Sequence, residues 1–197
     1  MQYKANSPFL YPMTPAEIDK KILELIAHPD QHNQALKLLI DTYQKRLYWQ
    51  IRRIVIHHDD ADDALQNTFI KAWQGLKNFN QNSSLFTWLY KIATNEALQI
   101  LRKKAQEKNI PYDEVAHYLS NSLTSDPYFK GDEIQKKLQQ AILRLPEKQK
   151  IVFNMRYYDE LSYEEMAEIL DTSVGALKAS YHHAVTKIEE YLLNQSE

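Results

Sequence analysis

Apolar residues recur three and four positions apart along most of the chain. Between Ala61 and Leu76 this spacing predicts a helix with one buried face, formed by Ala61, Ala64, Leu65, Thr68, Phe69, Ala72, Trp73 and Leu76. Similar patterns predict helices over residues 33–56 and 85–104. Two capping boxes, Thr14 to Glu17 and Ser162 to Glu165, predict where two further helices begin. With only three glycines and few alternating β-branched runs, the chain is predicted to be all-α.

Helical periodicity fails between residues 105 and 131, where Pro111, Pro127 and a cluster of Ser, Asn, Thr and Asp interrupt it. This composition predicts a flexible linker between two small helical domains. We therefore expect an N-terminal extension with a short helix at residues 1–30, a first domain at 31–104, the linker at 105–131 and a second domain at 132–197.

In the second domain, a short turn joins two predicted helices. The helices span residues 163–170 and 174–193, and Asp171, Thr172 and Ser173 form the turn. Two helices joined this tightly predict a helix-turn-helix, whose second helix can lie in the major groove of DNA.

The predicted helix that begins near Ala61 has a second line of residues at helical spacing, away from its apolar face. This line consists of Asp63, Gln66, Asn67 and Ile70. A helix that served only its own domain should be uniformly polar on that side. The isoleucine embedded among polar residues therefore indicates a protein partner.

Residues 78–84 are too polar and rich in turn formers to pack by themselves, which predicts an exposed loop. On the helix that follows, Trp88, Lys91 and Asn95 share one side with Gln99 and Arg102. An aromatic ring, an amide and a cation together suit stacking and hydrogen bonding with unpaired bases. Packing of these aromatic residues in the core is the competing interpretation. The helix predicted over residues 33–56 is expected to expose Lys45, Arg46, Arg52 and Arg53.

The formal net charge of −2 conceals an uneven distribution of charge. From Asp41 to Lys108 there are eleven Lys or Arg against seven Asp or Glu, whereas from Asp132 onward there are eight against twelve. Local electrostatic potential governs the approach to phosphates, so the first half of the chain is the better equipped to bind nucleic acid.

The chain has no cysteine, no long apolar run and no secretory signal, which predicts a cytoplasmic protein without disulfides.

The segment His57-His58-Asp59-Asp60 invites a metal-site interpretation. Adjacent helical side chains point about 100° apart and do not readily share one ion. We interpret the segment as a turn between helices in which Asp59 or Asp60 caps the next helix. A hydrolase built on these residues would need a nucleophile and an orienting partner that the pattern lacks. No metal, cofactor or enzymatic activity is therefore predicted.

Two sets of motifs resemble one protein family. Asp60-Ala61-Asp62-Asp63 with Gln66 and Phe69, then the run Thr87-Trp88-Leu89-Tyr90-Lys91-Ile92-Ala93 and Asn95, resemble region 2 of bacterial extracytoplasmic-function (ECF) sigma factors. The segments similar to sigma region 4 are Leu145-Pro146-Glu147-Lys148-Gln149, Arg156-Tyr157, Leu161 to Ala167, Val174-Gly175 and Lys178. The resemblance implies a subunit that binds core RNA polymerase and directs promoter recognition, DNA melting and transcription initiation. A helix-turn-helix regulator acting without polymerase is the alternative, and it would leave the line formed by Asp63, Gln66, Asn67 and Ile70 unexplained.

The resemblance also implies three sets of contact residues. The polymerase contact is expected at Asp63, Gln66, Asn67 and Ile70, although the family more often has an acid where Asn67 stands. The residues expected to contact minus-10 promoter DNA are Asn80, Gln81, Asn82, Ser83, Ser84, Thr87, Trp88, Lys91 and Asn95. Those expected to contact minus-35 promoter DNA are Ser173, Lys178, Ala179, Ser180, His182 and His183. Ala176, Ser180 and His183 replace the Thr, Arg and Arg common in the family. Many members also bind an anti-sigma factor, which would compete for the same faces.

Overall fold

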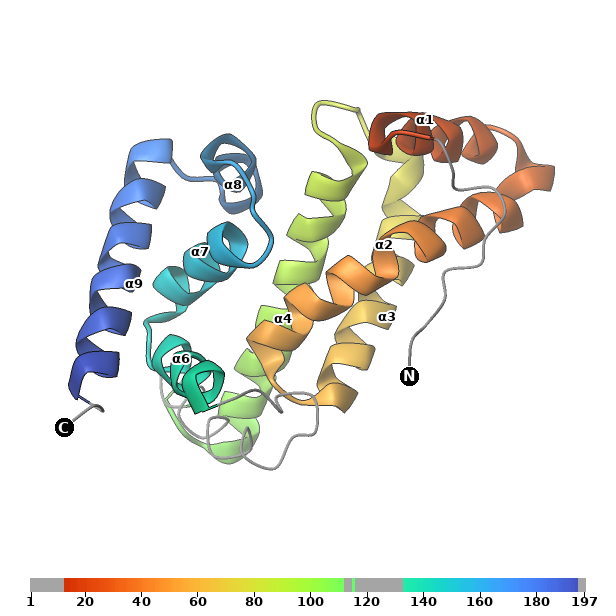
Figure 1. The fold of residues 1–197 in the computed structure, drawn as a ribbon. Helices are drawn as coiled ribbons and strands as arrows, with labels where there is room; N and C mark the ends of the chain where they lie inside the picture. Colours follow the sequence, from red (N-terminus) through yellow and green to blue (C-terminus); the bar gives the residue numbers. More distant parts are fainter. Residues whose placement is uncertain (1–12, 112–114, 116–132, 195–197) are drawn as a thin grey trace.

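The computed structural model describes residues 13–111, 115 and 133–194, and every regular element within these ranges is helical. Figure 1 shows two groups of helices side by side. The first comprises α1 (Pro15–Ile26), α2 (His32–Val55), α3 (His58–Gly75) and α4 (Leu85–Lys108), with short 3-10 turns η1 (Pro29–Gln31) and η2 (Leu76–Asn78). The second comprises α6 (Glu133–Leu143), α7 (Glu147–Tyr157), α8 (Tyr163–Leu170) and α9 (Val174–Asn194). The predicted all-α fold with two helical domains is confirmed.

Both predicted capping boxes are present. The Thr14 hydroxyl accepts from the Glu17 N–H at 3.3 Å, and the Glu17 carboxylate accepts from the Thr14 N–H at 2.6 Å. Ser162 and Glu165 form the same pair of bonds, at 3.2 and 2.8 Å. Each box satisfies backbone donors that a helix end leaves unpaired, so a few local residues define where α1 and α8 begin.

Two predicted helix ends differ in the structure. α4 continues to Lys108 and ends where Asn109 adopts a left-handed conformation with a φ of 50°, so it extends four residues into the predicted linker. Most of the remaining linker lies outside the described residues, as do residues 1–12 of the predicted N-terminal extension. The capping role predicted for Asp59 or Asp60 is wrong, because α3 begins at His58 without a side-chain cap. Asp60 instead forms an ion pair with Lys104 of α4.

The core of the first domain lies where α2 crosses α3 and α4. Leu39, Leu47 and Ile51 of α2 and Leu89 of α4 are fully buried in it. The prediction that α2 exposes four basic residues is half wrong: Lys45 and Arg46 are exposed, but Arg52 is buried and Arg53 is nearly so. For Arg53 the reason is tertiary, since its guanidinium pairs with Asp159 of the second domain. None of the described helices is long and apolar enough to cross a membrane.

Asp19 of α1 connects three helices of the first domain. Its carboxylate accepts hydrogen bonds from the Tyr43 hydroxyl of α2 and, at 3.1 Å, from the N–H of Leu85 at the start of α4. Burial raises the pKa of the Asp19 carboxyl, while these two donors oppose that rise by stabilising its charged form. α1 therefore helps to set the position of the loop that precedes α4.

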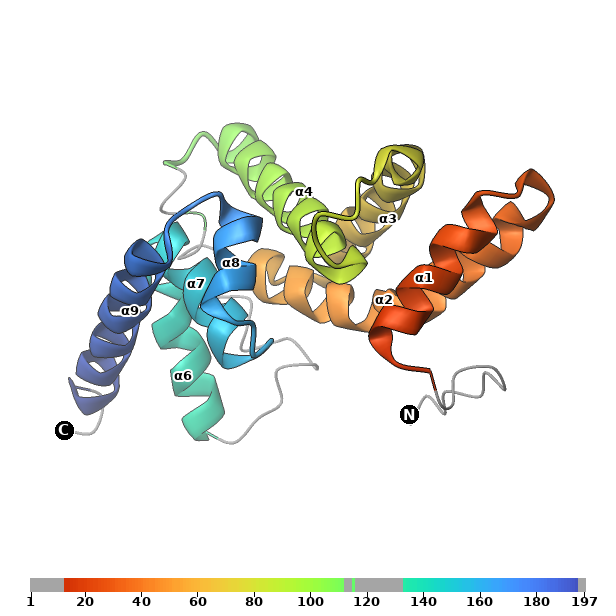
Figure 2. The same cartoon turned by 90° about the horizontal axis from the view of Figure 1, so that it is seen from above.

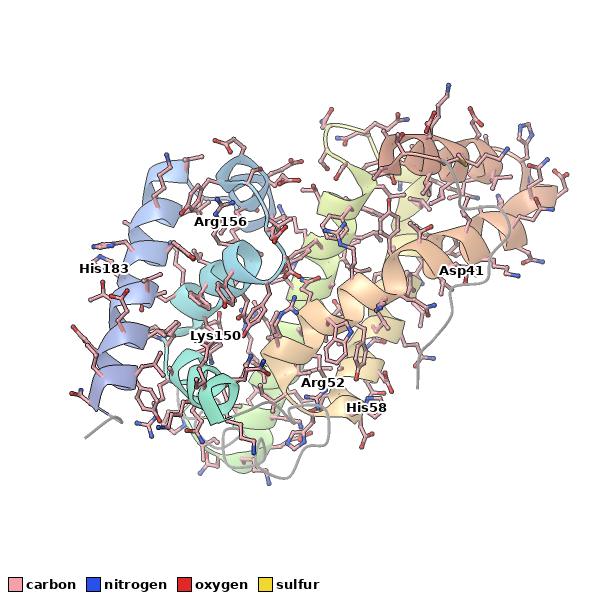
Figure 3. All side chains as sticks on the ribbon, in the orientation of Figure 1. Asp41, Arg52, His58, Lys150, Arg156 and His183 are labelled. Carbon is pink, nitrogen blue, oxygen red and sulfur yellow. The ribbon has the colours of Figure 1, made fainter. Side chains whose placement is uncertain are left out.

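Replacing Asp19 with alanine should destabilise the protein by about 1–3 kcal/mol, because the substitution leaves a partly buried hydroxyl and a backbone N–H without their acceptor. Urea unfolding followed by circular dichroism measures the change. Asp41→Ala, at an exposed position of α2 (Figure 3), is the matched control and should stay within about 0.5 kcal/mol of the parent. Equal stability of the two variants would show that Asp19 does not hold α1 in place.

Candidate functional site

The side of α3 that faces away from the core carries all four residues predicted to bind polymerase. Asp63, Gln66, Asn67 and Ile70 are exposed, and the side chain of Ile70 is 47% exposed. The opposite side of α3 is buried through Ala61, Ala64, Thr68, Phe69 and Ala72. An exposed isoleucine within a stripe of acid and amide groups gives this face the mixed character of a protein interface.

Two ion pairs hold α3 against α4. The Lys71 ammonium lies 2.5 Å from the carboxylate of Glu96, which is only 6% exposed, and Lys104 pairs with Asp60 at the other end of α3. Because both pairs join the same two helices, the orientation of the exposed stripe relative to α4 is defined.

His58 stands at the start of α3, and each of its ring nitrogens lies near a polar group. Its Nδ1 lies 2.7 Å from the Tyr48 hydroxyl, and its Nε2 lies 3.3 Å from a carboxylate oxygen of Asp62. Within the described ranges, no three His, Asp or Glu side chains are grouped so that they could hold a metal ion. The interactions of His58 are thus those of a residue that supports the turn between α2 and α3.

The loop between η2 and α4 projects from the first domain and presents three exposed side chains, Asn80, Gln81 and Asn82. The Asn80 side-chain oxygen accepts from the Asn82 N–H at 3.3 Å, so Asn80 shapes the loop. Gln81 has a left-handed φ of 58°, a conformation that costs a non-glycine residue roughly 1–2 kcal/mol. The loop therefore holds a defined and locally strained shape, a property common at functional sites.

An aromatic pair lies behind the loop. The rings of Phe79 and Trp88 have centroids 5.2 Å apart, and Trp88 is half-buried. Gly75 makes room for the indole, because a Cβ at this position would lie 3.1 Å from a Trp88 ring carbon. Trp88 thus offers only part of its surface to a ligand.

Thr87 departs from its predicted role at minus-10 DNA. It is 4% exposed, and its hydroxyl lies 2.8 Å from the Ser84 hydroxyl, which caps α4 by accepting from the Thr87 N–H at 3.0 Å. Thr87 therefore stabilises the start of α4 in this structure and does not face solvent. Ser84 is exposed and Ser83 is half-buried beside it.

Further along α4, Lys91 and Asn95 behave differently. Asn95 is exposed, as predicted, whereas the Lys91 ammonium lies 2.8 Å from the Asp171 carboxylate in the second domain. Lys91, which was predicted to contact DNA, is thus paired with an acidic group of the same chain.

The helix-turn-helix predicted in the second domain is formed by α8 and α9. α8 ends at Leu170, the capping residue Asp171 has a left-handed φ of 48°, and the Thr172 N–H bonds back to the Ala167 carbonyl at 3.2 Å. Ser173 caps α9 by accepting from the Ala176 N–H at 3.2 Å. The turn is therefore closed by local hydrogen bonds, and the start of α9 is left open to solvent at Ser173.

The residues predicted to meet minus-35 DNA lie mainly on the outer side of α9. Lys178, Ala179, His182 and His183 are exposed, and Ser180 is half-buried. Figure 3 shows His183 pointing away from the rest of the molecule. The Lys178 ammonium lies 5.6 Å from the centre of the Tyr163 ring, a cation–π contact that keeps it close to the start of α8.

The sequence pattern did not reveal the residues that join the two domains. Asp159 accepts hydrogen bonds from Arg53 of α2 and from the Tyr90 hydroxyl of α4, the latter at 2.7 Å. Burial, followed by the nearby Asp159 charge, raises the pKa of Tyr90 far above its ordinary value, so this phenol remains a donor. In the sequence, the one available signal of this contact between the domains was the opposite charge balance of the two halves.

Comparison with known proteins places both domains in one family. Residues 39–107 match the family model of sigma-70 region 2, and residues 135–188 match that of sigma-70 region 4. The ECF RNA polymerase sigma-E factor of Haemophilus influenzae is 30% identical over 179 residues, which cover 87% of this chain and 93% of the relative. The chain belongs to the ECF sigma factors. Such a factor binds core RNA polymerase and directs it to promoters, and this replaces the alternative of a regulator acting without polymerase.

Further relatives of this sigma factor share its length and fold. RNA polymerase sigma-H factor of Pseudomonas aeruginosa is 29% identical, with 91% of this chain and 96% of the relative covered. Among solved structures, the sigma factor RpoE from Bartonella quintana, in complex with the anti-sigma factor NepR, has a TM-score of 0.62 at 22% identity, covering 79% of this chain and 95% of that one. CnrH, in complex with the cytosolic domain of CnrY, has a TM-score of 0.64 at 20% identity, covering 91% and 99%.

Proposed function

We propose that this sigma factor binds the polymerase clamp through the exposed side of α3, formed by Asp63, Gln66, Asn67 and Ile70. The observation that carries this assignment is the exposure of all four residues on a helix whose other side is buried. Asp63 would pair with a cation, the two amides would donate and accept hydrogen bonds, and Ile70 would bury its apolar surface against the partner.

The loop before α4 is the proposed site for the minus-10 element. Asn80, Gln81 and Asn82 are exposed amides that match the hydrogen-bonding edges of bases, and bases have free edges only when they are unpaired. Trp88 lies directly behind the loop, where its exposed part can stack on an extruded base. Asn95 extends the same surface along α4. The assignment of Thr87 to this contact is not retained, because its hydroxyl is used within the cap of α4.

The exposed side of α9 is the proposed site for the minus-35 duplex. The N-terminus of α9 at Ser173 presents unpaired N–H groups and the positive end of the helix dipole, which favour a phosphate. Lys178 adds a cation, whereas His182 and His183 provide hydrogen-bonding rings at the outer surface. With few fixed positive charges on this helix, DNA contact by the second domain alone is expected to be weak.

A Lys178→Ala variant should show a shallower salt dependence of holoenzyme binding to promoter DNA. Loss of one phosphate contact lowers the slope of log K against log salt concentration by about one. Lys187→Ala is the matched control, since Lys187 is also an exposed lysine of α9 but lies outside the proposed contact, and its slope should equal that of the parent. An unchanged slope in Lys178→Ala would remove this residue from the interface.

Co-purification tests the proposed function as a whole. The tagged full chain should retain core RNA polymerase from a cytoplasmic extract, and the complex should initiate transcription at promoters that core polymerase alone does not use. A chain that binds promoter DNA but retains no polymerase would contradict the proposal.

The same experiment can reveal an anti-sigma factor. We propose such a partner because the structurally similar sigma factor RpoE was solved in complex with one.

A further inference from the structure

The start of α4 contacts a helix that lies outside the residues matched by the region 2 family model. That match covers residues 39–107, whereas α1 spans Pro15–Ile26. Figure 2 shows α1 running alongside α2, with its start next to the start of α4, and Figure 1 shows the same neighbours from the side. A contact at this point can influence the loop that ends where α4 begins.

Asp19 of α1 supplies an acceptor to the first turn of α4. The first N–H groups of a helix have no partner within it, and the Ser84 side chain accepts from the N–H of Thr87. The N–H of Leu85, the first residue of α4, donates to the Asp19 carboxylate at 3.1 Å. The carboxylate also lies at the positive end of the α4 dipole, which strengthens this contact.

Aromatic packing holds the same turn from the side of α2. The Tyr43 hydroxyl donates to the other carboxylate oxygen of Asp19, and the Tyr43 ring stacks on that of Phe86, with centroids 6.1 Å apart. The Arg46 guanidinium lies 3.8 Å from the centre of the same Phe86 ring. Tyr43 and Phe86 are both buried, so α1, α2 and α4 meet in one closely packed contact around Asp19.

α1 is itself held at both ends. The capping box of Thr14 defines its start, and Nε2 of His32 lies 3.1 Å from the carbonyl oxygen of Ile26 at its end. Between them Ile22 is fully buried in the core. A carboxylate carried by a helix fixed in this way has a defined position, as a group that positions another requires.

The loop before α4 depends on contacts at both of its ends, because it contains a strained residue. Gln81 adopts a left-handed backbone, and such conformations persist only where the surrounding structure holds them. At the η2 end, Leu76 is buried and its carbonyl accepts from the Phe79 N–H at 3.2 Å. At the α4 end, the bond from Leu85 to Asp19 holds the chain.

We propose that α1 takes part in promoter opening and that Asp19 is a positioning residue for base capture. By holding Leu85, Asp19 fixes the first turn of α4, and with it the loop amides and the ring of Trp88, in the arrangement that receives extruded bases. This inference rests on the proposed minus-10 site. A preformed site has no loop left to order when bases leave the duplex, so loss of Asp19 slows opening without weakening polymerase binding.

Loop mobility in the free full-length chain tests the positioning role without DNA. The chain has no cysteine, so Asn82→Cys in the exposed loop gives a unique site for a nitroxide spin label. Asp19→Ala should shorten the rotational correlation time of this label at least about twofold. Asp19→Asn should keep the parent value, since its side-chain oxygen can still accept from the Leu85 N–H. An unchanged label in Asp19→Ala would overturn the positioning role and leave the proposed minus-10 site intact.

Ile22→Val is the matched control within α1. It removes one buried methyl group and weakens the packing of the helix, but it leaves both carboxylate oxygens of Asp19 in place. The control should keep the label mobility and the opening rate of the parent, which separates the role of Asp19 from a general loss of stability. Circular dichroism checks that every variant is folded.

Promoter opening by the holoenzyme is measured with unlabelled chains and a fluorescent base analogue in the minus-10 element. Asp19→Ala should slow open-complex formation about three- to tenfold, as expected for one lost hydrogen bond, while the dissociation constant for core polymerase stays within about twofold of the parent value. Asp19→Asn should restore the opening rate. Slower opening with equally weakened polymerase binding would contradict a positioning role.

The loop variant Asn82→Ala separates failure of this inference from failure of the minus-10 site. A looser loop with opening at the parent rate in Asp19→Ala, but impaired opening in Asn82→Ala, would refute the role of Asp19 alone. A looser loop with parent opening rates in both variants would refute the minus-10 site, and the role of Asp19 in opening with it.

Discussion

A variant that combines Asp63→Arg with Gln66→Ala is expected to lose core polymerase while it keeps its fold. Both side chains are exposed on α3, so neither substitution removes a core contact. Reversing the charge of Asp63 places a cation against the group that would pair with it in the interface, and truncating Gln66 removes a hydrogen-bonding partner. We expect the dissociation constant for core polymerase to rise at least about 100-fold, or roughly 2.7 kcal/mol.

Fluorescence anisotropy with labelled sigma factor and purified core polymerase measures this change. Asp41→Arg provides the matched charge reversal at an exposed position on α2 (Figure 3) and should bind as the parent does. Equal binding by a folded Asp63→Arg, Gln66→Ala variant would contradict the assignment of the clamp contact to α3.

Substitution of the loop amides should separate promoter melting from polymerase binding. Asn82→Ala is the cleaner test, because the Asn82 side chain makes no hydrogen bond within the described part of the chain, whereas the Asn80 side chain accepts from the Asn82 N–H. Loss of one amide contact to an extruded base should cost about 1–2 kcal/mol in the open complex, which lowers its formation about 5- to 30-fold. Asn80→Ala combines this loss with a change of loop shape and should have the larger effect.

A fluorescent base analogue within the minus-10 element reports opening, and polymerase affinity is measured in parallel. Asn33→Ala, at an exposed position near the start of α2, is the matched control. The expected pattern is impaired opening with unchanged polymerase affinity. Opening at the parent rate in both loop variants would exclude the loop from base capture.

Several features of the fold and site were predictable because their causes are local in the sequence. A capping box uses residues three positions apart, and the buried face of α3 repeats every three or four residues, so both can be identified without a tertiary structure. The exposed stripe of α3 is the complement of that buried face. The helix-turn-helix likewise depends on a turn of three residues.

The roles of Arg53 and Lys91 could not be predicted in the same way, because their acidic partners come from distant parts of the chain. Periodicity placed Arg53 on the polar side of α2, yet its side chain is only 14% exposed and pairs with Asp159 of the second domain. Thr87 has the polarity of a contact residue but bonds within the cap of α4.

The sequence by itself determined the helices, their caps, the exposed side of α3 and the separation of charge between the two halves, since each depends on residue type and short-range spacing. Only the tertiary structure decided which of those charges meet. Arg53 and Asp159 are 106 positions apart, and Lys91 and Asp171 are 80 apart. No pattern along the chain specifies such pairs, because their contact depends on how two separately folded surfaces pack, and burial then decides which polar groups remain available to polymerase and DNA.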